Sequence, residues 1–543
     1  MIRDKEIENS IYILDILRNI GRSSELQASV FFTADDFEQG NLIYSRKDKQ
    51  LLYIPKNIPD RYQIGQTISI SFVLKETLFD FDSQIIDIRD NSLVLDFPKV
   101  FRSSFKRRYS RYIPETDEDM YILLNDGSQC EVKDINTAGV SFYSESLNLD
   151  IDDNIRNLCI IFEQSQVCID ARIKYIIPSS GSQLLYGTEF DDIDWFSNYS
   201  LFKYIFRKTY PDICEITDFS RETIYQLYEE SDYFKLKPRK EIEISFNDMI
   251  ETMNKIKIYP HIISNPVFYH QDKIYMGASA LRIYNNTFLA QHLAAIPQSR
   301  LFPSSKTSVY LAINDYLLCN PYFKYYLTYF DATNKWHNKM YQSIGNYIDD
   351  ENKFLYETID YFECYYDSYD ASSKSYLKCK VLKNYDEFIS YANANLPGLY
   401  CAAHGYNHLD FEIKEMKQIY AMAGIYAQRQ VFKITDKEKT VAYGVVELYS
   451  KGLNLYNVLD MIRLYIVDRS YDFNKIFIAA INECKFFFEK YQKSKFNIFV
   501  KLSENERNSI SIKGVKYDFL VGSVMADRNG SVEYKNLFLN MTR

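Results

Sequence analysis

KRRYSR at Lys106–Arg111 and DINTAG at Asp134–Gly139 are the two stretches that decide which fold this chain is expected to adopt. The first holds two arginines four residues apart, Arg107 and Arg111. It lies within residues 99–114, a segment that contains six basic residues and no acidic one. The whole chain has a formal net charge of −9, whereas this segment is positively charged. A positive charge in one segment of an acidic chain suits a site for an anion. The second stretch is typical of a turn that follows a strand.

The sequence between and after these stretches has the pattern of a small antiparallel barrel. Met120–Val132 predicts two short strands around the turn Asn125–Gly127, which is a strong hairpin signal. Further strands are expected at Val140–Tyr143, Leu158–Glu163, Gln166–Ile177 and Leu184–Phe190. Their number and length suit a small closed barrel, and a helix is expected to leave it over Trp195–Pro211.

The residue types in the two stretches suit a compact dianion that carries guanine. A planar guanidinium matches the O6/N7 edge of guanine and also forms paired bonds with phosphate. A carboxylate such as Asp134 cannot favour phosphate, but it can accept from the N–H groups of guanine. Gly139 lets the backbone turn sharply or approach a flat base.

In this order the two stretches resemble the ligand motif of PilZ domains, Arg-x-x-x-Arg followed by Asp/Asn-x-Ser-x-x-Gly. The resemblance extends over roughly Phe105 to Tyr210 and implies a receptor for the bacterial second messenger cyclic di-GMP. It implies these ligand-binding residues: Arg107, Arg108, Arg111, Asp134, Asn136 and Gly139, with Lys106 and Ala138 as secondary candidates. Asn136 replaces the serine of the family pattern; it can still donate and accept a hydrogen bond, but it is larger.

Simpler interpretations of both stretches remain open. A basic run is usually a solvated face or a weak nucleic-acid patch, and an Asp-x-Asn-x-x-Gly string is usually an ordinary turn. Some PilZ proteins have also lost their ligand and act as protein adaptors. The sequence therefore leaves three hypotheses: a cyclic di-GMP receptor with an output domain, a cyclic di-GMP-regulated N-acyltransferase, or an adaptor without ligand.

The N-terminal part, residues 1–104, is expected to be a separate β-domain. A helix is predicted over Asp4–Ile20 from its apolar spacing, and a β-rich stretch follows from Gln27 to Pro98. Its position before a PilZ-like domain, residues 105–212, resembles the N-terminal domain of flagellar-brake proteins. In that architecture the arginine motif lies on the connector between two barrels, where the ligand could lock their orientation.

Residues 213–543 predict a mixture of helices and strands, and the expected fold class is therefore multidomain, with two small antiparallel β-barrels followed by an α/β region. Two halves, about 240–380 and 381–543, share a strand–strand–helix–strand order that resembles a GNAT acyltransferase fold, which could be tandem. The family's Arg/Gln-x-x-Gly-x-Gly/Ala loop, which implies acetyl-CoA or another acyl-CoA, is missing from both halves. In the first half the corresponding segment is Gln298–Lys306, which is basic and has serines that could cap a helix. In the second half it is Asp468–Asp472, which has two carboxylates. Glu447 could be a general base or part of a salt bridge, and catalytic residues remain unknown.

Composition narrows the class of protein. Hydrophobic residues make up 46% of the 543 residues and charged residues 25%, as in a folded soluble chain, and no apolar run reaches about 18 residues. The start of the chain lacks a signal-peptide core, so a cytoplasmic protein without a membrane span is expected. The nine cysteines have no zinc spacing and are expected to be mostly small core residues of a reduced protein.

No metal site and no nucleic-acid partner are expected, and a protein partner is expected for output. His404 and His408 are four apart, but their surroundings favour a turn over a metal-binding helix.

Overall fold

The computed structural model describes residues 5–7, 13, 17, 20, 26–31, 37–45, 50–55, 62–74, 77–89, 92–105, 111–115, 118–145, 147–163, 165–179, 183–191, 193–236, 239–365, 369, 375–456, 458–493 and 495–542. The chain divides into two compact units, Met1–Ser110 and Arg111–Phe538. Each unit is described by itself below.

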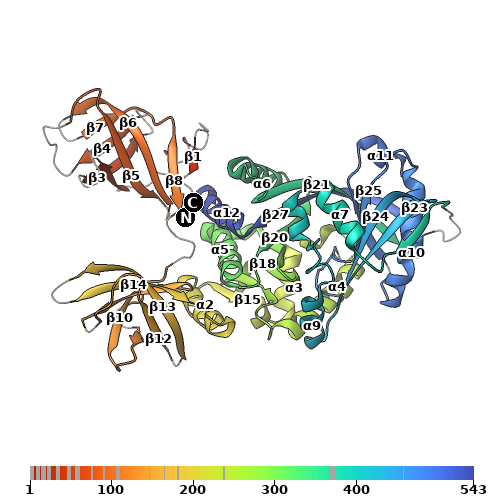
Figure 1. Cartoon of the computed structure of the whole chain (residues 1–543), viewed down its shortest axis with the longest axis horizontal. Coiled ribbons are helices and arrows are strands. Elements are labelled where there is room, and N and C mark those ends of the chain that lie inside the picture. Colours follow the sequence, from red (N-terminus) through yellow and green to blue (C-terminus); the bar gives the residue numbers. More distant parts are fainter. Residues whose placement is uncertain are drawn as a thin grey trace. The chain divides into compact units, whose positions relative to one another are not determined.

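The first unit is a curved antiparallel sheet around an aromatic core (Figure 1). Its strands are β1 (Lys5–Ile7), β2 (Leu26–Phe31), β3 (Phe37–Ser45), β4 (Gln50–Pro55), β5 (Thr67–Leu74), β6 (Thr77–Arg89), β7 (Ser92–Leu95) and β8 (Phe101–Phe105). They lie in the order β1-β8-β6-β5-β2-β3-β4-β7. Because β6 also pairs with β7, the strands from β2 to β7 form a closed ring of pairings. Phe72, Phe79, Phe81 and Phe101 pack together inside it.

The helix predicted over Asp4–Ile20 is wrong at its start. Residues Lys5–Ile7 form strand β1 and pair with β8, because the apolar spacing that suggests a helix also suits a short edge strand. Ile13, Leu17 and Ile20 are helical and buried, and the residues of that stretch other than these and Lys5–Ile7 lie outside the part that the structure describes.

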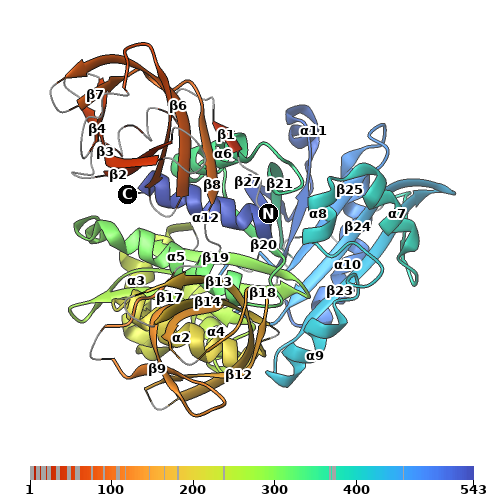
Figure 2. The same cartoon turned by 60° about the vertical axis from the view of Figure 1, so that its left-hand side comes forward.

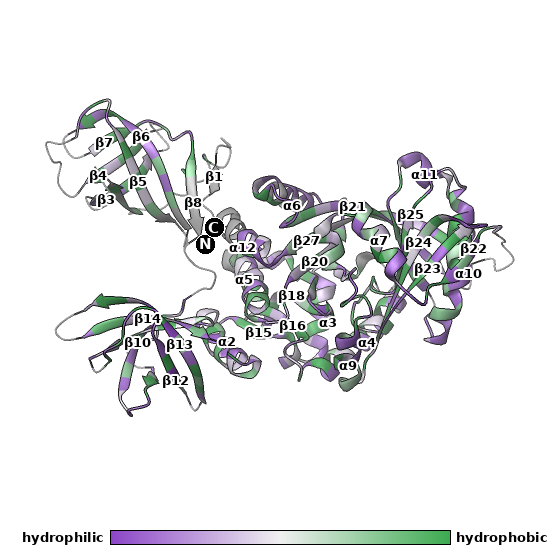
Figure 3. Ribbon diagram, viewed as in Figure 1, coloured by the Kyte–Doolittle hydropathy of each residue, from purple (hydrophilic) through white to green (hydrophobic). Residues whose placement is uncertain are grey.

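The second unit begins with a closed antiparallel barrel of six strands, as the sequence predicts (Figure 2). The strands are β9 (Met120–Leu123), β10 (Gln129–Asn136), β11 (Gly139–Ser144), β12 (Asn154–Phe162), β13 (Ser165–Pro178) and β14 (Leu184–Asp191), in the order β10-β11-β14-β13-β12-β9. Buried and exposed residues alternate along β13. Figure 3, which colours the ribbon by hydropathy, shows both hydrophilic and hydrophobic residues on the barrel strands. The predicted helix follows as α2 (Trp195–Thr209), capped by Asp194, and buries Leu201 and Tyr204 against the barrel core.

The rest of the second unit is one sheet of thirteen strands with helices packed on it (Figure 1). The strands are β15 (Ile213–Glu215), β16 (Ile263–Ser264), β17 (Pro266–His270), β18 (Lys273–Tyr284), β19 (Thr287–Ala295), β20 (Tyr325–Asp331), β21 (Phe354–Tyr365), β22 (Lys378–Val381), β23 (Ala427–Asp436), β24 (Lys439–Tyr449), β25 (Met461–Ile466), β26 (Lys495–Val500) and β27 (Val515–Asp527). The α-helices are α3 (Arg221–Glu230), α4 (Arg239–Ile256), α5 (Pro303–Cys319), α6 (Lys335–Ile348), α7 (Asp386–Asn395), α8 (Gly398–Ala403), α9 (Lys414–Met422), α10 (Phe473–Lys490), α11 (Glu504–Ser509) and α12 (Arg528–Thr542). Short 3-10 turns lie at η1 (Ile216–Asp218), η2 (Tyr233–Leu236) and η3 (Pro297–Leu301).

The sheet is mixed and contains two parallel pairs, one in each of the two segments expected from the sequence to be halves. β19 runs parallel to β20 with α5 between them in the chain, and β25 runs parallel to β26 with α10 between them. β27, from the end of the chain, lies between β20 and β21, while β21 pairs on its other side with β26. The two halves therefore share one continuous sheet.

Helix α5 contacts the barrel as well as the sheet. Near its C-terminal end the thiol of Cys319 is buried, which raises its pKa to about 12. The Cys319 carbonyl accepts from Asn198 Nδ2 of α2 at 3.3 Å. The ring of Tyr316 packs on that of Phe202, also on α2. Helix α5 thus joins α2, which packs on the barrel core, to the sheet.

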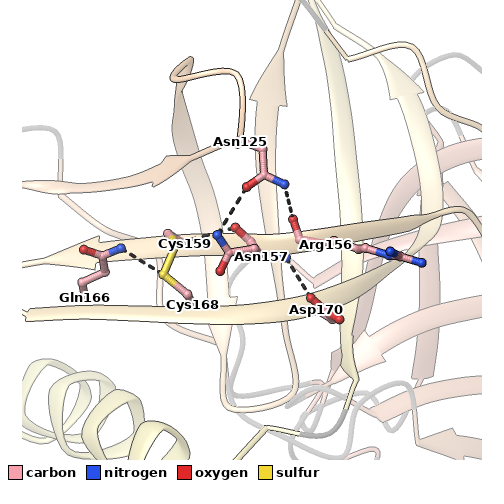
Figure 4. Close-up of a disulfide and its surroundings, with 7 residues drawn as sticks. All are labelled: Asn125, Arg156, Asn157, Cys159, Gln166, Cys168 and Asp170. Atoms are coloured by element: carbon pink, nitrogen blue, oxygen red, sulfur yellow. Dashed lines mark hydrogen bonds between the residues drawn. A yellow bond between two sulfur atoms is a disulfide. The ribbon is translucent and has the colours of Figure 1, made fainter.

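Two cysteines of the barrel depart from the sequence prediction. Cys159 on β12 and Cys168 on β13 are direct cross-strand neighbours and form a disulfide, with their Cα atoms 4.0 Å apart (Figure 4). The sequence could not indicate this pair, because only the register of the β12–β13 hairpin sets the two side chains opposite each other. Most of the other cysteines are buried core residues, as predicted: Cys130, Cys319, Cys364, Cys401 and Cys484.

Candidate functional site

The DINTAG hairpin is held in one conformation by its own side chains and by β14. Asn136 Oδ1 accepts from the backbone N–H of Ala138 at 2.8 Å, and Phe190 N–H donates to the Ala138 carbonyl at 2.8 Å. A Cβ on Gly139 would lie 2.1 Å from the carbonyl oxygen of Thr188, so only glycine lets the two strands approach this closely. The hairpin that carries the candidate residues is therefore rigidly placed.

Arg111 and Asp134 meet close to the turn of this hairpin, where Asp134 pairs with Ser141. Arg111 Nη1 donates to Asp134 Oδ2 at 2.9 Å and lies 2.8 Å from Oδ1 of the same carboxylate. The Ser141 hydroxyl donates to Asp134 Oδ1 at 2.9 Å and lies 2.8 Å from the Tyr175 hydroxyl. The side chains of Arg111 and Asp134 keep 25% and 12% of their exposure, so the pair faces solvent in part.

A cavity of about 90 Å³ lies beside this ion pair. Five of the eight residues proposed from the sequence line it: Arg111, Asp134, Asn136, Ala138 and Gly139. Lys106, Arg107 and Arg108 lie outside the described residues. The cavity suits one edge of a single planar ring, so a larger ligand would extend beyond it.

Three further residues shape this cavity and were missed from the sequence. Ser141, Tyr175 and Thr188 line it, from β11, β13 and β14. Ser141 stands two positions after Gly139 on a predicted strand, which places it on the same face, so strand alternation alone could have indicated it. Tyr175 and Thr188 come from strands distant in sequence, and no local pattern points to them.

The two loops considered for acyl-CoA offer little to a pyrophosphate. Ahead of α5, Ser305 is buried and donates to the Ser299 carbonyl at 3.4 Å, and the helix begins without a side-chain cap, so the expected serine cap is wrong for Ser305. Ahead of α10, the Asp472 side chain accepts from Asn474 N–H and occupies the helix N-terminus. A hydrogen bond from Lys439 lowers the pKa of Asp468 in the same loop. That loop therefore presents negative charge where an anion would have to bind.

Glu447 is a buried structural anion and is poorly suited to act as a general base. It accepts from Arg429 Nε at 2.8 Å, from Tyr284 at 2.8 Å and from Arg463 Nε at 3.4 Å. Burial alone would raise its pKa, but the two guanidinium groups and the Tyr284 hydroxyl lower it. With both carboxylate oxygens engaged and 1% of the residue exposed, Glu447 has no access to a substrate.

The histidine pair does not lie on one helix. His404 follows the end of α8, is fully buried, and its Nδ1 lies 2.9 Å from the Tyr400 carbonyl, whereas His408 is exposed and pairs with Asp386 at 3.0 Å. Within the described residues, no group of three or more His, Cys, Asp or Glu side chains is arranged to hold a metal ion. Among the helices described, none has the length and apolar character needed to cross a membrane.

Comparison with known proteins gives no family model and no curated protein that matches the chain. Among solved structures, the chain is similar to the K. pneumonia MrkH–c-di-GMP complex at 15% identity, over 38% of this chain and 96% of that chain, with a TM-score of 0.31. It is similar to YcgR from Escherichia coli in complex with c-di-GMP at 15% identity, over 37% and 91%, with a TM-score of 0.30. A tandem GNAT protein from the clavulanic acid biosynthesis pathway matches at 8% identity, over 49% and 83%, with a TM-score of 0.28. Because these identities and scores are low, the function is inferred below from this chain's own contacts.

Proposed function

We propose that this chain is a cytoplasmic receptor for cyclic di-GMP. The barrel of β9–β14 is then a PilZ-type domain, and the C-terminal sheet is a tandem GNAT-like output region. The observation that supports this best is the Arg111–Asp134 corner, where a donor fork and an acceptor lie together on the edge of a cavity. The proposed binding residues are Arg107, Arg108, Arg111, Asp134, Asn136 and Gly139, with Lys106 and Ala138 beside them.

The corner presents a hydrogen-bond pattern that suits guanine. Guanine offers O6 and N7 as acceptors, which match the guanidinium of Arg111, and its ring and amino N–H groups match the carboxylate of Asp134. Adenine has an amino donor in place of O6, and that donor would face the N–H groups of Arg111. A donor that the bound base leaves without an acceptor disfavours that base, so we expect selection of guanine over adenine.

The rest of the ligand would be held by the basic connector. Arg107 is four residues from Arg111, so its Cα lies at most about 14 Å away from that of Arg111 in any conformation. A cavity of about 90 Å³ holds one edge of a base, which leaves the two phosphates outside it and within reach of Arg107 and Arg108.

Titration calorimetry on the full chain tests this proposal, with cyclic di-GMP and cyclic di-AMP as the two ligands. We expect binding of cyclic di-GMP and at least about tenfold weaker binding of cyclic di-AMP. Arg107→Ala and Arg111→Ala should each weaken binding at least about tenfold. Arg156→Ala, which removes an exposed arginine from β12 of the same barrel, is the matched control and should bind like the wild type.

Two results would oppose the proposal in different ways. Absence of heat with cyclic di-GMP would favour the adaptor without ligand. Equal weakening in Arg156→Ala and Arg111→Ala would mean that total charge matters and the corner does not. For output we propose contact with a protein partner, and we assign no acyl transfer, because neither candidate loop offers an anion site.

A further inference from the structure

The disulfide of the barrel lies on the outer face of its strands. Leu158 and Ile160, on either side of Cys159, belong to the buried core, so strand alternation turns Cys159 outward. On β9 the neighbour of Cys159 is Leu123, which pairs in turn with Gln129 at the start of β10. The DINTAG hairpin follows the other end of β10, so the disulfide and the proposed nucleotide site lie at opposite ends of that strand.

The two sulfur atoms of the disulfide differ in their access to solvent. Cys168 is exposed, whereas Cys159 keeps only 5% of its exposure. Gln166, two residues before Cys168 on β13, donates through Nε2 to Cys168 Sγ at 2.9 Å (Figure 4). A hydrogen-bond donor stabilises the anionic form of the group that it bonds, so this amide favours the reactive thiolate of Cys168 once the disulfide is open. A small thiol reagent therefore has access to Cys168 and little access to Cys159.

The pairing of β12 with β13 does not depend on the disulfide. Ladder pairs flank it on both sides along the two strands. The irregular segment of β12 just before it is held by hydrogen bonds from Asn157, whose N–H donates to Asp170 Oδ1 at 2.8 Å and whose side chain donates to Asn125 Oδ1 at 3.3 Å. After reduction the Cys159 thiol can donate to the Asn157 carbonyl, which lies 3.6 Å from the sulfur. The barrel can thus keep its fold in both redox states.

We propose that Cys159 and Cys168 are a reversible redox pair that exchanges with a low-molecular-weight disulfide of the glutathione type. An accessible disulfide is the kind that small thiols open, and an exposed cysteine beside a second one is the arrangement of a redox-sensing site. Cys168 is the attacking cysteine, because it is exposed, and Cys159 is the resolving cysteine.

The exchange proceeds in two steps. The Cys168 thiolate attacks one sulfur of the small disulfide, forms a mixed disulfide with it and displaces one small thiolate. The Cys159 thiolate then attacks Cys168 Sγ, closes the protein disulfide and displaces the second small thiolate. The two displaced thiolates take up the two protons that the protein thiols lose. Two protein thiols are thereby oxidised and one small disulfide is reduced to two thiols, and an excess of small thiol reverses the reaction.

Glutathione and glutathione disulfide test the proposal on the full chain. Free thiols are alkylated after each incubation, and mass spectrometry of the digest reports the state of each cysteine. The wild type should form the Cys159–Cys168 bond in excess glutathione disulfide and lose it in excess glutathione, with the same circular dichroism in both states. A bond that opens only in denaturant would be structural and would overturn the proposal, as would two thiols that stay free in excess glutathione disulfide.

Two serine variants separate the roles of the two cysteines. Cys159→Ser lacks the resolving thiol and should accumulate glutathione on Cys168, whereas Cys168→Ser should take up glutathione on Cys159 at least about tenfold more slowly, because that sulfur is buried. Cys379→Ser, which changes a half-buried free cysteine on β22, is the control and should leave the exchange unchanged. Acid trapping of the wild type early in the reaction gives the same reading without a variant. Equal rates in the two folded variants, or a trapped mixed disulfide on Cys159, would contradict the proposal.

Discussion

Arg111 with Asp134 in the barrel and Arg429 and Arg463 with Glu447 in the sheet are both contacts between arginine and a carboxylate. The first pair keeps part of its exposure and borders a cavity, whereas the side chains of the second group are at most 2% exposed and pack against tyrosine rings. The Coulomb attraction has the same origin in both. What differs is whether water or a ligand can replace one partner.

This difference indicates which charges serve binding and which serve folding. A partly solvated pair can exchange its mutual hydrogen bonds for bonds to a ligand at small cost. In a fully buried group the loss of one partner leaves an uncompensated charge in the protein interior. The four predictions below test that division, and they are ordered by the size of the expected effect.

Glu447→Gln should cause the largest loss. It leaves Arg429 and Arg463 buried without a counter-charge, and removing one partner of a buried pair typically costs about 3–5 kcal/mol. Chemical denaturation of the full chain measures the change in the free energy of unfolding. Glu438→Gln, which changes an exposed acid in the β23–β24 turn, is the control and should stay within about 0.5 kcal/mol; similar values for both variants would mean that the buried group is not important for stability.

Buried His292 should make the sheet sensitive to acid. Its pKa is lowered to about 4 in the folded protein, below the ordinary value of 6.5, so the unfolded chain binds more protons between these values. The stability that it contributes is complete above pH 6.5 and declines as the pH falls toward 4, by up to about 1.4 kcal/mol for each pH unit. Denaturation at several pH values compares the wild type with His292→Gln, whose acid slope should be smaller; identical slopes would exclude this histidine as the cause.

Gly139→Ala should disturb both fold and binding at the barrel corner. The new methyl would lie 2.1 Å from the Thr188 carbonyl, so β14 must move away from the hairpin, at a cost of about 1–3 kcal/mol. Gly345→Ala in α6, where the new methyl would meet only the Phe354 ring at 3.5 Å, is the matched control and should be neutral or stabilising. A Gly139→Ala protein as stable as Gly345→Ala would show that the hairpin tolerates displacement.

Arg111→Ala should have the smallest effect on folding and a clear effect on binding. Because the ion pair is partly solvated, its loss should cost less than about 1 kcal/mol in the free energy of unfolding. The same variant should lose affinity for cyclic di-GMP, measured by calorimetry on the same sample. If unfolding changed as much as in Glu447→Gln, the division between binding and folding charges would be wrong.

Local patterns in the sequence predicted the barrel well. Its strands β10 and β13 alternate in burial, its first turn carries Asn125–Gly127, and the helix after it ends within two residues of the predicted bound. The elements that were missed depend on distant partners. β8 and β27 received no prediction, because their strand character comes from the neighbours that they pair with.

Two segments of the C-terminal region also differ from the prediction. The charge of Glu229–Glu243 predicts a linker or an exposed helix start; the segment holds the end of α3, the turn η2 and the start of α4, so the helix start is confirmed, but Tyr233 and Phe234 in it pack against a buried cluster. The sequence also predicts a helix over Leu409–Gln428, but α9 begins only at Lys414 and ends at Met422, and β23 begins at Ala427. In both cases tertiary packing outweighs the local charge and apolar spacing.

The residues of the candidate site also fall into those that a local motif indicates and those that distant strands supply. Asp134, Asn136 and Gly139 belong to one short motif, and the sequence indicated them together. Tyr175 reaches the site only because β13 and β14 pair in one register, which brings its ring against Gly187. The sheet also contains a cavity of about 540 Å³ that was invisible from the sequence, since its wall comes from strands and helices spread over some three hundred residues.

Helix α5 gives the two hollows of the second unit a common support. Near its C-terminal end the Cys319 carbonyl accepts from Asn198 of α2, which packs on the barrel core, and Tyr310 and Asn314, up to nine residues earlier, line the cavity of about 540 Å³ between β19 and β20. Nine residues of helix span about 14 Å. We therefore expect a displacement of α2 on the barrel to be transmitted along α5 to one wall of that cavity.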